Sequence, residues 1–307
     1  MERVFTLMRI LLAYITIVLL WATTPLAIKW SGEGHGFLFG VTARMCIGTV
    51  CILIAMLLAR QPLLLHRKAL FTYLAVALQI YGAMLPVYWA AQFIPSGWLS
   101  VVSGLTPLMT ALLSAIFLKG QRLTIGKLIA YSLGIAGLYV MFGSALQLGD
   151  HAVLGIIGVL ASTLFHSISA VWIKRINTPI PALSTVAGGL LIALPAYLFT
   201  WGLVDGHLPT TLTQTTLASI IYLGVIATTL GFIFYYYLLA NLAATRVALI
   251  TLITPLLSLL LGDMINHETL DLKTLLGAVL IISALIIHEF FERLPSFKSK
   301  SKYKERR

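Results

Sequence analysis

The sequence contains few charged residues. Asp, Glu, Lys and Arg together make up 10% of its 307 residues, against the roughly 25% that is typical of soluble domains. Hydrophobic residues make up 59% of the chain, and the mean hydropathy is +0.97. This composition excludes a water-soluble globular protein and indicates an integral membrane protein, so the lipid bilayer is its first expected partner.

Residues that bind metals or catalyse reactions are also scarce. The two cysteines, Cys46 and Cys51, lie in one apolar run, where their spacing gives neither a redox pair nor a metal site. The seven histidines are scattered, and no HExxH or GxSxG motif occurs. We therefore expect no enzyme activity, no metal and no cofactor.

Long apolar runs recur along the whole chain, bounded by charged or turn residues. About 20 apolar residues span a bilayer as a helix, whereas membrane strands need shorter alternating segments, which the sequence lacks. The sequence therefore predicts an all-α membrane protein with ten transmembrane helices, although nine or eleven stay open. The expected spans are residues 8–29, 37–59, 69–91, 97–117, 123–142, 153–173, 182–202, 216–239, 246–263 and 272–291.

The positive charges indicate how these spans are oriented. If the N-terminus is inside, every basic residue except Lys29, Arg44 and Lys273 falls on the cytoplasmic side. This bias follows the positive-inside rule and predicts that both termini are cytoplasmic. The net charge of +11 therefore reflects membrane topology, and we expect no nucleic-acid partner.

The first five expected helices resemble the last five. An offset of 148 positions places Pro107 on Pro255, and an offset of 145 places Lys29 on Lys174. An odd number of spans per repeat makes the second copy enter the membrane from the opposite side, so the repeats are expected to be inverted. The predicted units are a first repeat at residues 1–148, a second repeat at 149–292 and a basic cytoplasmic tail at 293–307.

Inverted repeats of this kind are typical of carriers that work by alternating access, because the interface between the halves can close on either face of the membrane. A static duplication, such as a channel or a scaffold, is the alternative reading of the same symmetry.

Two stretches carry a family resemblance. Gly97–Tyr139, with Pro107 in mid-helix, and Leu217–Ile287, with Thr254-Pro255 and His267-Glu268-Thr269-Leu270, resemble the EamA repeat of the drug/metabolite transporter superfamily. In that pattern a glutamate usually precedes the last helix of each repeat: Glu268 matches it, whereas Gln121 departs from it. The departure favours a structural role for Glu268.

The resemblance implies a ten-helix transporter of small metabolites in the bacterial inner (plasma) membrane, most often an exporter of amino acids or related compounds. Carrier sites of this class lie near the bilayer midplane between the repeats. We therefore searched the span centres for polar and aromatic residues spaced at helical steps. The candidate substrate-binding residues are Tyr14, Trp21, Thr24, Arg44, Gln79, Trp89, Ser103, His166, Ser169, Tyr222, Thr229, Tyr236 and Thr251.

These candidates have ordinary structural alternatives. Hydroxyl residues at such spacing also pack membrane helices together, and Trp and Tyr also populate membrane interfaces. Pro107 and Pro255 each free a backbone carbonyl near mid-membrane, so both are expected as helix breaks.

Ionisable groups within the spans are functional candidates because they are costly to bury in lipid. Arg44 lies about 10 Å deep by the helical rise and could bind a substrate carboxylate or phosphate. Alternatively, it reaches outward or pairs with Glu33, Asp263 or Glu268. His166 could bind substrate, carry a coupling proton or only bond within the bundle.

Charged residues at the span ends have a simpler explanation. The side chains of Lys29 and Lys174 are expected to reach outward to the lipid headgroups, and His288 and Glu289 are expected at the inner interface. Taken together, the sequence predicts a secondary transporter that exports amino acids or related amphipathic zwitterions or anions, as a monomer or a homodimer. A drug or nucleotide-type metabolite carrier, a channel and a non-transport scaffold are the alternatives.

Overall fold

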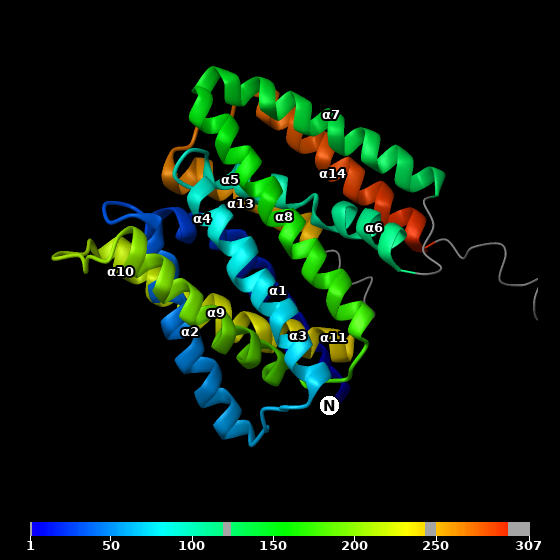
Figure 1. The fold of residues 1–307 in the computed structure, drawn as a ribbon. Helices are drawn as coiled ribbons and strands as arrows, with labels where there is room; N and C mark the ends of the chain where they lie inside the picture. The colour runs from blue at the N-terminus through cyan, green and yellow to red at the C-terminus, as the bar shows by residue number, and fades with distance from the viewer. Residues whose placement is uncertain (1, 119–123, 243–249, 294–307) are drawn as a thin grey trace, which may run out of the picture.

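The computed structural model describes residues 2–118, 124–242 and 250–293, and every regular element in these ranges is a helix (Figure 1). The elements are α1 (Glu2–Ser31), α2 (Phe37–Ala59), α3 (Arg67–Ala77), η1 (Leu78–Ala83), α4 (Met84–Ala90), α5 (Ser96–Ser103), α6 (Thr106–Phe117), α7 (Ile125–Leu148), α8 (Asp150–Ile176), α9 (Ala182–Val204), α10 (Gln214–Ile221), η2 (Tyr222–Leu230), α11 (Gly231–Asn241), α13 (Ile250–Asn266) and α14 (Leu272–Arg293).

These elements form the expected membrane spans. Within the described residues, nine helical runs are long and apolar enough to cross a membrane, and α13 is a shorter apolar helix. Three of the runs are composite: α3–η1–α4, α5–α6 and α10–η2–α11. The all-α membrane fold is therefore confirmed, with α2 at the residues predicted for it. Neither the inverted relation of the two halves nor the predicted unit boundaries follow from these helix bounds, and both stay predictions.

Polar residues cap several of the helices. His66, Thr124 and Thr213 precede α3, α7 and α10, and each side chain accepts a hydrogen bond from a backbone N–H in the first turn. Such caps satisfy donors that have no partner inside the helix. At the other end, Arg60 and Asn177 terminate α2 and α8 in the left-handed conformation, with φ of 51° and 48°.

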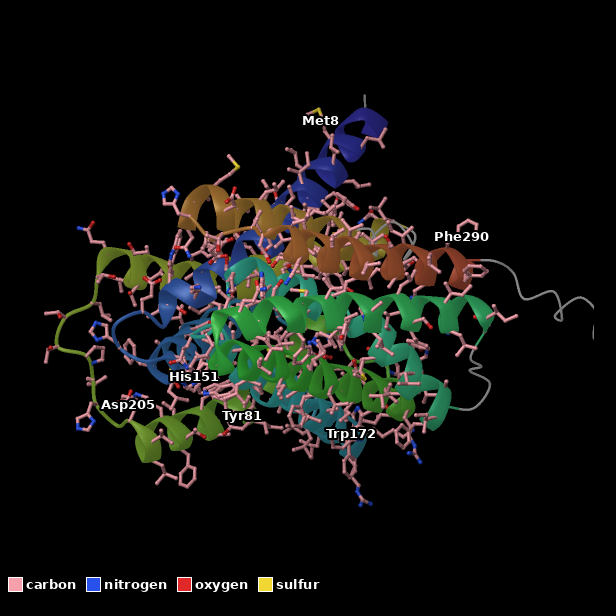
Figure 2. The ribbon with its side chains drawn as sticks, turned by 90° about the horizontal axis from the view of Figure 1, so that it is seen from above. Met8, Tyr81, His151, Trp172, Asp205 and Phe290 are labelled. Atoms are coloured by element: carbon pink, nitrogen blue, oxygen red, sulfur yellow. The ribbon has the colours of Figure 1, made fainter. Side chains whose placement is uncertain are left out.

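A single large core joins both halves of the chain. It contains buried residues from Ala27 on α1 to Leu285 on α14, and its largest fully buried side chains include Trp98 and Tyr197. The outer surface is also apolar: Met8 and Phe290, for example, are exposed at the periphery (Figure 2). An apolar exterior around a close-packed core fits a protein whose surroundings are lipid.

Successive spans alternate in direction, so α1 begins and α14 ends at the same side of the bundle. We call this side, at Glu2 and Arg293, the termini face. The opposite side, where α1 ends at Ser31 and α14 begins at Leu272, is the far face.

The helices α7 and α14 lie side by side along their length (Figure 1). Glycines allow this approach: a Cβ at Gly137 would lie 2.8 Å from the carbonyl oxygen of Gly277 and 3.0 Å from the amide nitrogen of Ile281. Small residues at membrane helix contacts allow backbones to pack closely. The contact therefore tolerates no side chain at this position without a backbone shift.

We expect Gly137→Val to lower the stability of the purified protein by about 1–3 kcal/mol, the range for overpacked sites. Gly143→Val, on the same helix, is the matched control, because a Cβ there meets no atom within 4 Å. Thermal unfolding in detergent would measure both. Equal stability of the two variants would contradict the close contact between α7 and α14.

Candidate substrate cavity

A cavity of about 690 Å³ lies between helices from both halves of the chain. Its walls come from α1, η1, α4, α5, α6, α8, α11, α13 and α14. The polar and aromatic side chains that line it are Trp21, Thr24, Ser100, Ser103, Thr106, Thr110, Ser114, Ser162, Thr163, His166, Lys174, Tyr235, Thr251, Thr254, His288 and Glu289.

The cavity brings together five of the candidate substrate-binding residues, which are Trp21, Thr24, Ser103, His166 and Thr251. Both Pro107 and Pro255 also line it. The structure thus collects residues that are far apart in the sequence around one space.

Aromatic and imidazole rings form part of the wall. The ring of Trp21 on α1 packs against that of Tyr235 on α11, with centroids 5.4 Å apart and planes tilted by 32°. His166 on α8 faces the cavity, and its Nε2 lies 3.5 Å from Nε2 of Gln79, which supports the ring from η1. Gln79 therefore contacts a cavity residue without lining the cavity itself.

The two prolines behave differently. The helix is interrupted before Pro107, where α5 ends at Ser103 and α6 begins at Thr106. The carbonyl of Ser103, which Pro107 cannot bond, accepts a hydrogen bond of 2.6 Å from Thr106 Oγ1. By contrast, α13 runs through Pro255 without interruption.

A hydroxyl chain ties this break to α8. Thr110 Oγ1 donates to Ser167 Oγ at 3.0 Å, and Ser167 Oγ donates to the carbonyl of Thr106 at 3.3 Å. Irregular backbone at membrane depth persists only where nearby groups satisfy its polar atoms. The backbone carbonyls at the break between α5 and α6 thus accept hydrogen bonds from side chains of α6 and α8.

Arg44 does not line the cavity. Its side chain is 6% exposed and lies between α2, α4 and η2, where Nη1 donates to the Tyr88 hydroxyl at 3.1 Å and Nε donates to Thr228 Oγ1 at 3.3 Å. Its guanidinium also lies 5.9 Å from the centroid of the Tyr88 ring. Arg44 therefore does not reach outward, and within the described residues it forms no ion pair with any of the acidic partners considered for it.

Several other candidates pack helices together instead of lining the cavity. Ser169 Oγ donates to the carbonyl of Ala75 at 2.6 Å and joins α8 to α3. The ring of Trp89 lies against Gly158 of α8, where a Cβ would be 3.0 Å from Trp89 Cε3, and Tyr14 packs into a small apolar cluster with α11 and α13. These positions illustrate the structural alternatives for hydroxyl and aromatic residues.

Two candidates lie in the π-helix η2. The hydroxyl of Tyr222 is 2.6 Å from Thr23 Oγ1, beside a smaller apolar cavity of about 320 Å³. Thr229 Oγ1 donates to the carbonyl of Gly224, five residues earlier, at 3.4 Å. Both side chains therefore bond within the bundle.

One described tyrosine just beyond the π-helix lines the cavity. The side chain of Tyr236 is outside the described part of the structure, and it is Tyr235 that lines the wall. In a π-helix the backbone bonds reach five residues instead of four, so each residue turns through a smaller angle. Helical steps of seven residues from Tyr222 through Thr229 to Tyr236 therefore do not mark one face across η2.

Several charged or ionisable residues near the helix ends are expected at the membrane interface. Lys174, His288 and Glu289 line the cavity near its termini face, and Lys174 is exposed, so the interfacial positions stay predictions. His288 is 3% exposed. The outward orientation predicted for Lys29 is wrong, because its Nζ lies 3.5 Å from Glu268 Oε1. Gln121, the departure from the resemblance, lies outside the described residues.

The sequence also matches a known protein family. Residues 8–143 and 153–288 each match the model of the EamA-like transporter family. The chain belongs to this family. EamA-like transporters are membrane proteins, and the repeated match agrees with the two similar halves of the sequence.

Several known proteins are similar to this chain over most of its length. The chain is 23% identical to the uncharacterized transporter YoaV of Bacillus subtilis, over 92% of this chain and 98% of that protein. It is 31% identical to a probable amino-acid metabolite efflux pump of Salmonella typhimurium, over 68% of this chain and 73% of that protein. A solved crystal structure with 22% identity superposes with a TM-score of 0.63, covering 92% of this chain and 98% of its own. That structure supports the fold alone.

We expect Arg44→Ala to lower the stability of this EamA-like protein by about 1–3 kcal/mol, because buried hydrogen-bonding groups lose their partner. Thermal unfolding and membrane abundance would measure the loss. Arg175→Ala, at an exposed position on α8, is the matched control. Normal stability combined with loss of transport would instead assign Arg44 to substrate binding.

Proposed function

We propose that this chain exports amino acids or related amphipathic zwitterions or anions by alternating access. The observation that carries the proposal is the cavity between the two halves. Its volume of about 690 Å³ falls within the roughly 300–1,000 Å³ of small-molecule sites. A small molecule in this cavity lies within reach of the hydroxyl groups around the break between α5 and α6.

The chemistry of the wall suits a molecule with an apolar part and two charges. Trp21 and Tyr235 offer aromatic surface for an apolar side chain. Lys174 and Glu289 offer one cation and one carboxylate, which would attract the carboxylate and the ammonium of a zwitterion. Such attractions are stronger beside low-dielectric walls than in bulk water.

The relatives support the same substrate class. Three of them carry names that refer to amino acids, among them the Salmonella typhimurium efflux pump and a probable terminal-alkyne amino-acid exporter of Streptantibioticus cattleyicolor, 22% identical over 90% of this chain. These names support the proposed substrate class and the proposed direction of transport, and the cavity supports the proposed site. The candidate residues within it, which are Trp21, Thr24, Ser103, His166 and Thr251, are the proposed binding set.

The cavity also favours one direction of access. Its lining includes Ser114, Lys174 and Glu289, near the ends of α6, α8 and α14 at the termini face. With both termini in the cytoplasm, as the basic residues predict, the cavity extends toward the cytoplasm. An exporter loads its substrate in this state.

We expect cells that overproduce the protein to enrich one compound class in the medium, and Trp21→Ala or His166→Gln to abolish the enrichment at equal membrane abundance. Untargeted metabolite comparison of medium and cells would measure it. Trp172→Ala is the matched control, since this tryptophan of α8 is not among the cavity residues (Figure 2).

The compound class decides between the candidate substrates. Enrichment of amino acids or their derivatives supports the proposal, and enrichment of nucleotides or drug-like cations overturns the substrate class. Enrichment that survives both cavity substitutions overturns the site.

A thiol on the loop between α1 and α2 would test the orientation. Glu33 is exposed there, at the far face. In a chain whose two native cysteines are replaced by alanine, we expect Glu33→Cys to react with a membrane-impermeant maleimide in right-side-out vesicles and not in sealed inside-out ones. The reverse pattern would place the termini outside the cytoplasm.

A further inference from the structure

A network of hydrogen bonds and one ion pair closes the bundle at the far face. Its centre is the carboxylate of Glu268, in the connection between α13 and α14. Oε1 lies 3.5 Å from Lys29 Nζ and accepts a hydrogen bond of 2.8 Å from Asn266 Nδ2. Oε2 accepts hydrogen bonds from Ser96 Oγ at 2.9 Å and from the backbone N–H of Gly97 at 3.4 Å.

These contacts join segments from both family-matched halves of the chain. Lys29 lies in the last turn of α1, and its Nζ also donates to the carbonyl of Ile94, just before α5, at 3.1 Å. Trp30 Nε1 donates to Asn266 Oδ1 at 3.0 Å. The start of α5 and the end of α1 are thus fastened to the α13–α14 connection, and none of them can move away from it without losing these bonds.

The backbone is shaped to hold the carboxylate. Glu268 is 9% exposed, and its backbone N–H donates to the carbonyl of Gly262 at 3.1 Å. A Cβ at Gly262 would lie 2.5 Å from Glu268 Oε2, so the absence of a side chain makes room for the oxygen. The preceding residue, His267, has a φ of 51°, which is uncommon for a non-glycine residue.

The network lies directly beyond the cavity. Ile28, one residue before Lys29, lines the cavity, and so does Leu99, two residues after Gly97. The lining then continues toward the termini face, to Lys174 and Glu289. A substrate in the cavity therefore meets the Glu268 network on its way to the far face.

We propose that Glu268 and Lys29 form a lock that holds the far face closed, and that breaking it exposes the cavity to that face. The inference rests on the proposed alternating-access function. Separating the two halves at the far face must break the ion pair together with the bonds to Ser96 and Gly97. Separating a buried ion pair costs free energy when either charge stays buried without its partner. Lys29, however, is already 26% exposed. Water that enters on opening hydrates both groups, so the lock is reversible.

Thiol accessibility tests the lock without any substrate. The parent chain carries Ser103→Cys in the cavity wall, with Cys46 and Cys51 replaced by alanine. A membrane-impermeant maleimide is applied to vesicles of both orientations, and the labelling rate is measured from each face. Glu33→Cys, in a separate chain, identifies which vesicles expose the far face.

Three changes disturb the lock in different ways. Glu268→Gln removes the negative charge, Lys29→Gln removes the positive charge, and Gly262→Ala keeps both charges but displaces the carboxylate. Asp271→Asn is the matched control: this acid lies three residues after Glu268, but it caps α14 through Thr274 and accepts from Ser144 on α7.

We expect the parent and Asp271→Asn to label rapidly from the termini face and slowly from the far face. Each lock variant is expected to label about tenfold faster from the far face, a change typical of a modest shift between two conformations. If Glu268→Gln fails to reach the membrane, Lys29→Gln and Gly262→Ala still decide the question.

Unchanged far-face labelling in Gly262→Ala and Lys29→Gln, at normal abundance, would overturn the lock. Rapid far-face labelling of the parent would overturn it as well. Failure of the transport proposal is separate: faster far-face labelling in the variants supports the lock even when no amino acid is exported.

Discussion

Every backbone polar group of a membrane-spanning chain must find a partner within the protein, because the lipid offers none. This constraint explains why the described residues form only helices, and it also explains the places where the helices are irregular. Where Pro107 interrupts the hydrogen-bond ladder, Thr106 supplies the missing donor to the carbonyl of Ser103. In η2, Thr228 and Thr229 donate to the carbonyls of Leu223 and Gly224, five residues earlier. Hydroxyl side chains thus make irregular backbone possible within the bundle.

The same constraint determines what the sequence could predict. Hydrophobic runs revealed the spans because a membrane helix needs length and apolar composition, and both can be read directly along the chain. The site was predicted in part, because Trp21, Thr24 and His166 lie in regular stretches of α1 and α8 where helical steps stay in phase. Across η2 the phase changes, so regular helical steps counted from Tyr222 do not lead to Tyr235, which lines the cavity. No sequence pattern marks a π-turn.

The polar side chains at the helix ends could not be assigned from the sequence for a different reason. A lysine near the end of a membrane span is first expected to extend its side chain to the lipid headgroups. Whether it does so depends on which other helix ends lie nearby. Lys29 meets Glu268, a residue more than two hundred positions later, only because α1 and the α13–α14 connection share one corner of the fold. Arg44 likewise found tyrosine and threonine hydroxyls from α4 and η2 instead of a carboxylate.

The position of the Glu268 network has an electrical consequence. A hydrated cavity that extends toward the termini face carries the potential of that side into the middle of the membrane. The voltage then falls mainly across the sealed layer between the cavity and the far face, instead of across the full hydrocarbon thickness of about 30 Å. Charges in that layer experience a focused field, and moving one elementary charge across the full potential is worth about 2.3 kcal/mol per 100 mV. Lys29 and Glu268 lie in this layer, so in the proposed cytoplasm-open state the resting membrane voltage acts directly on their contact.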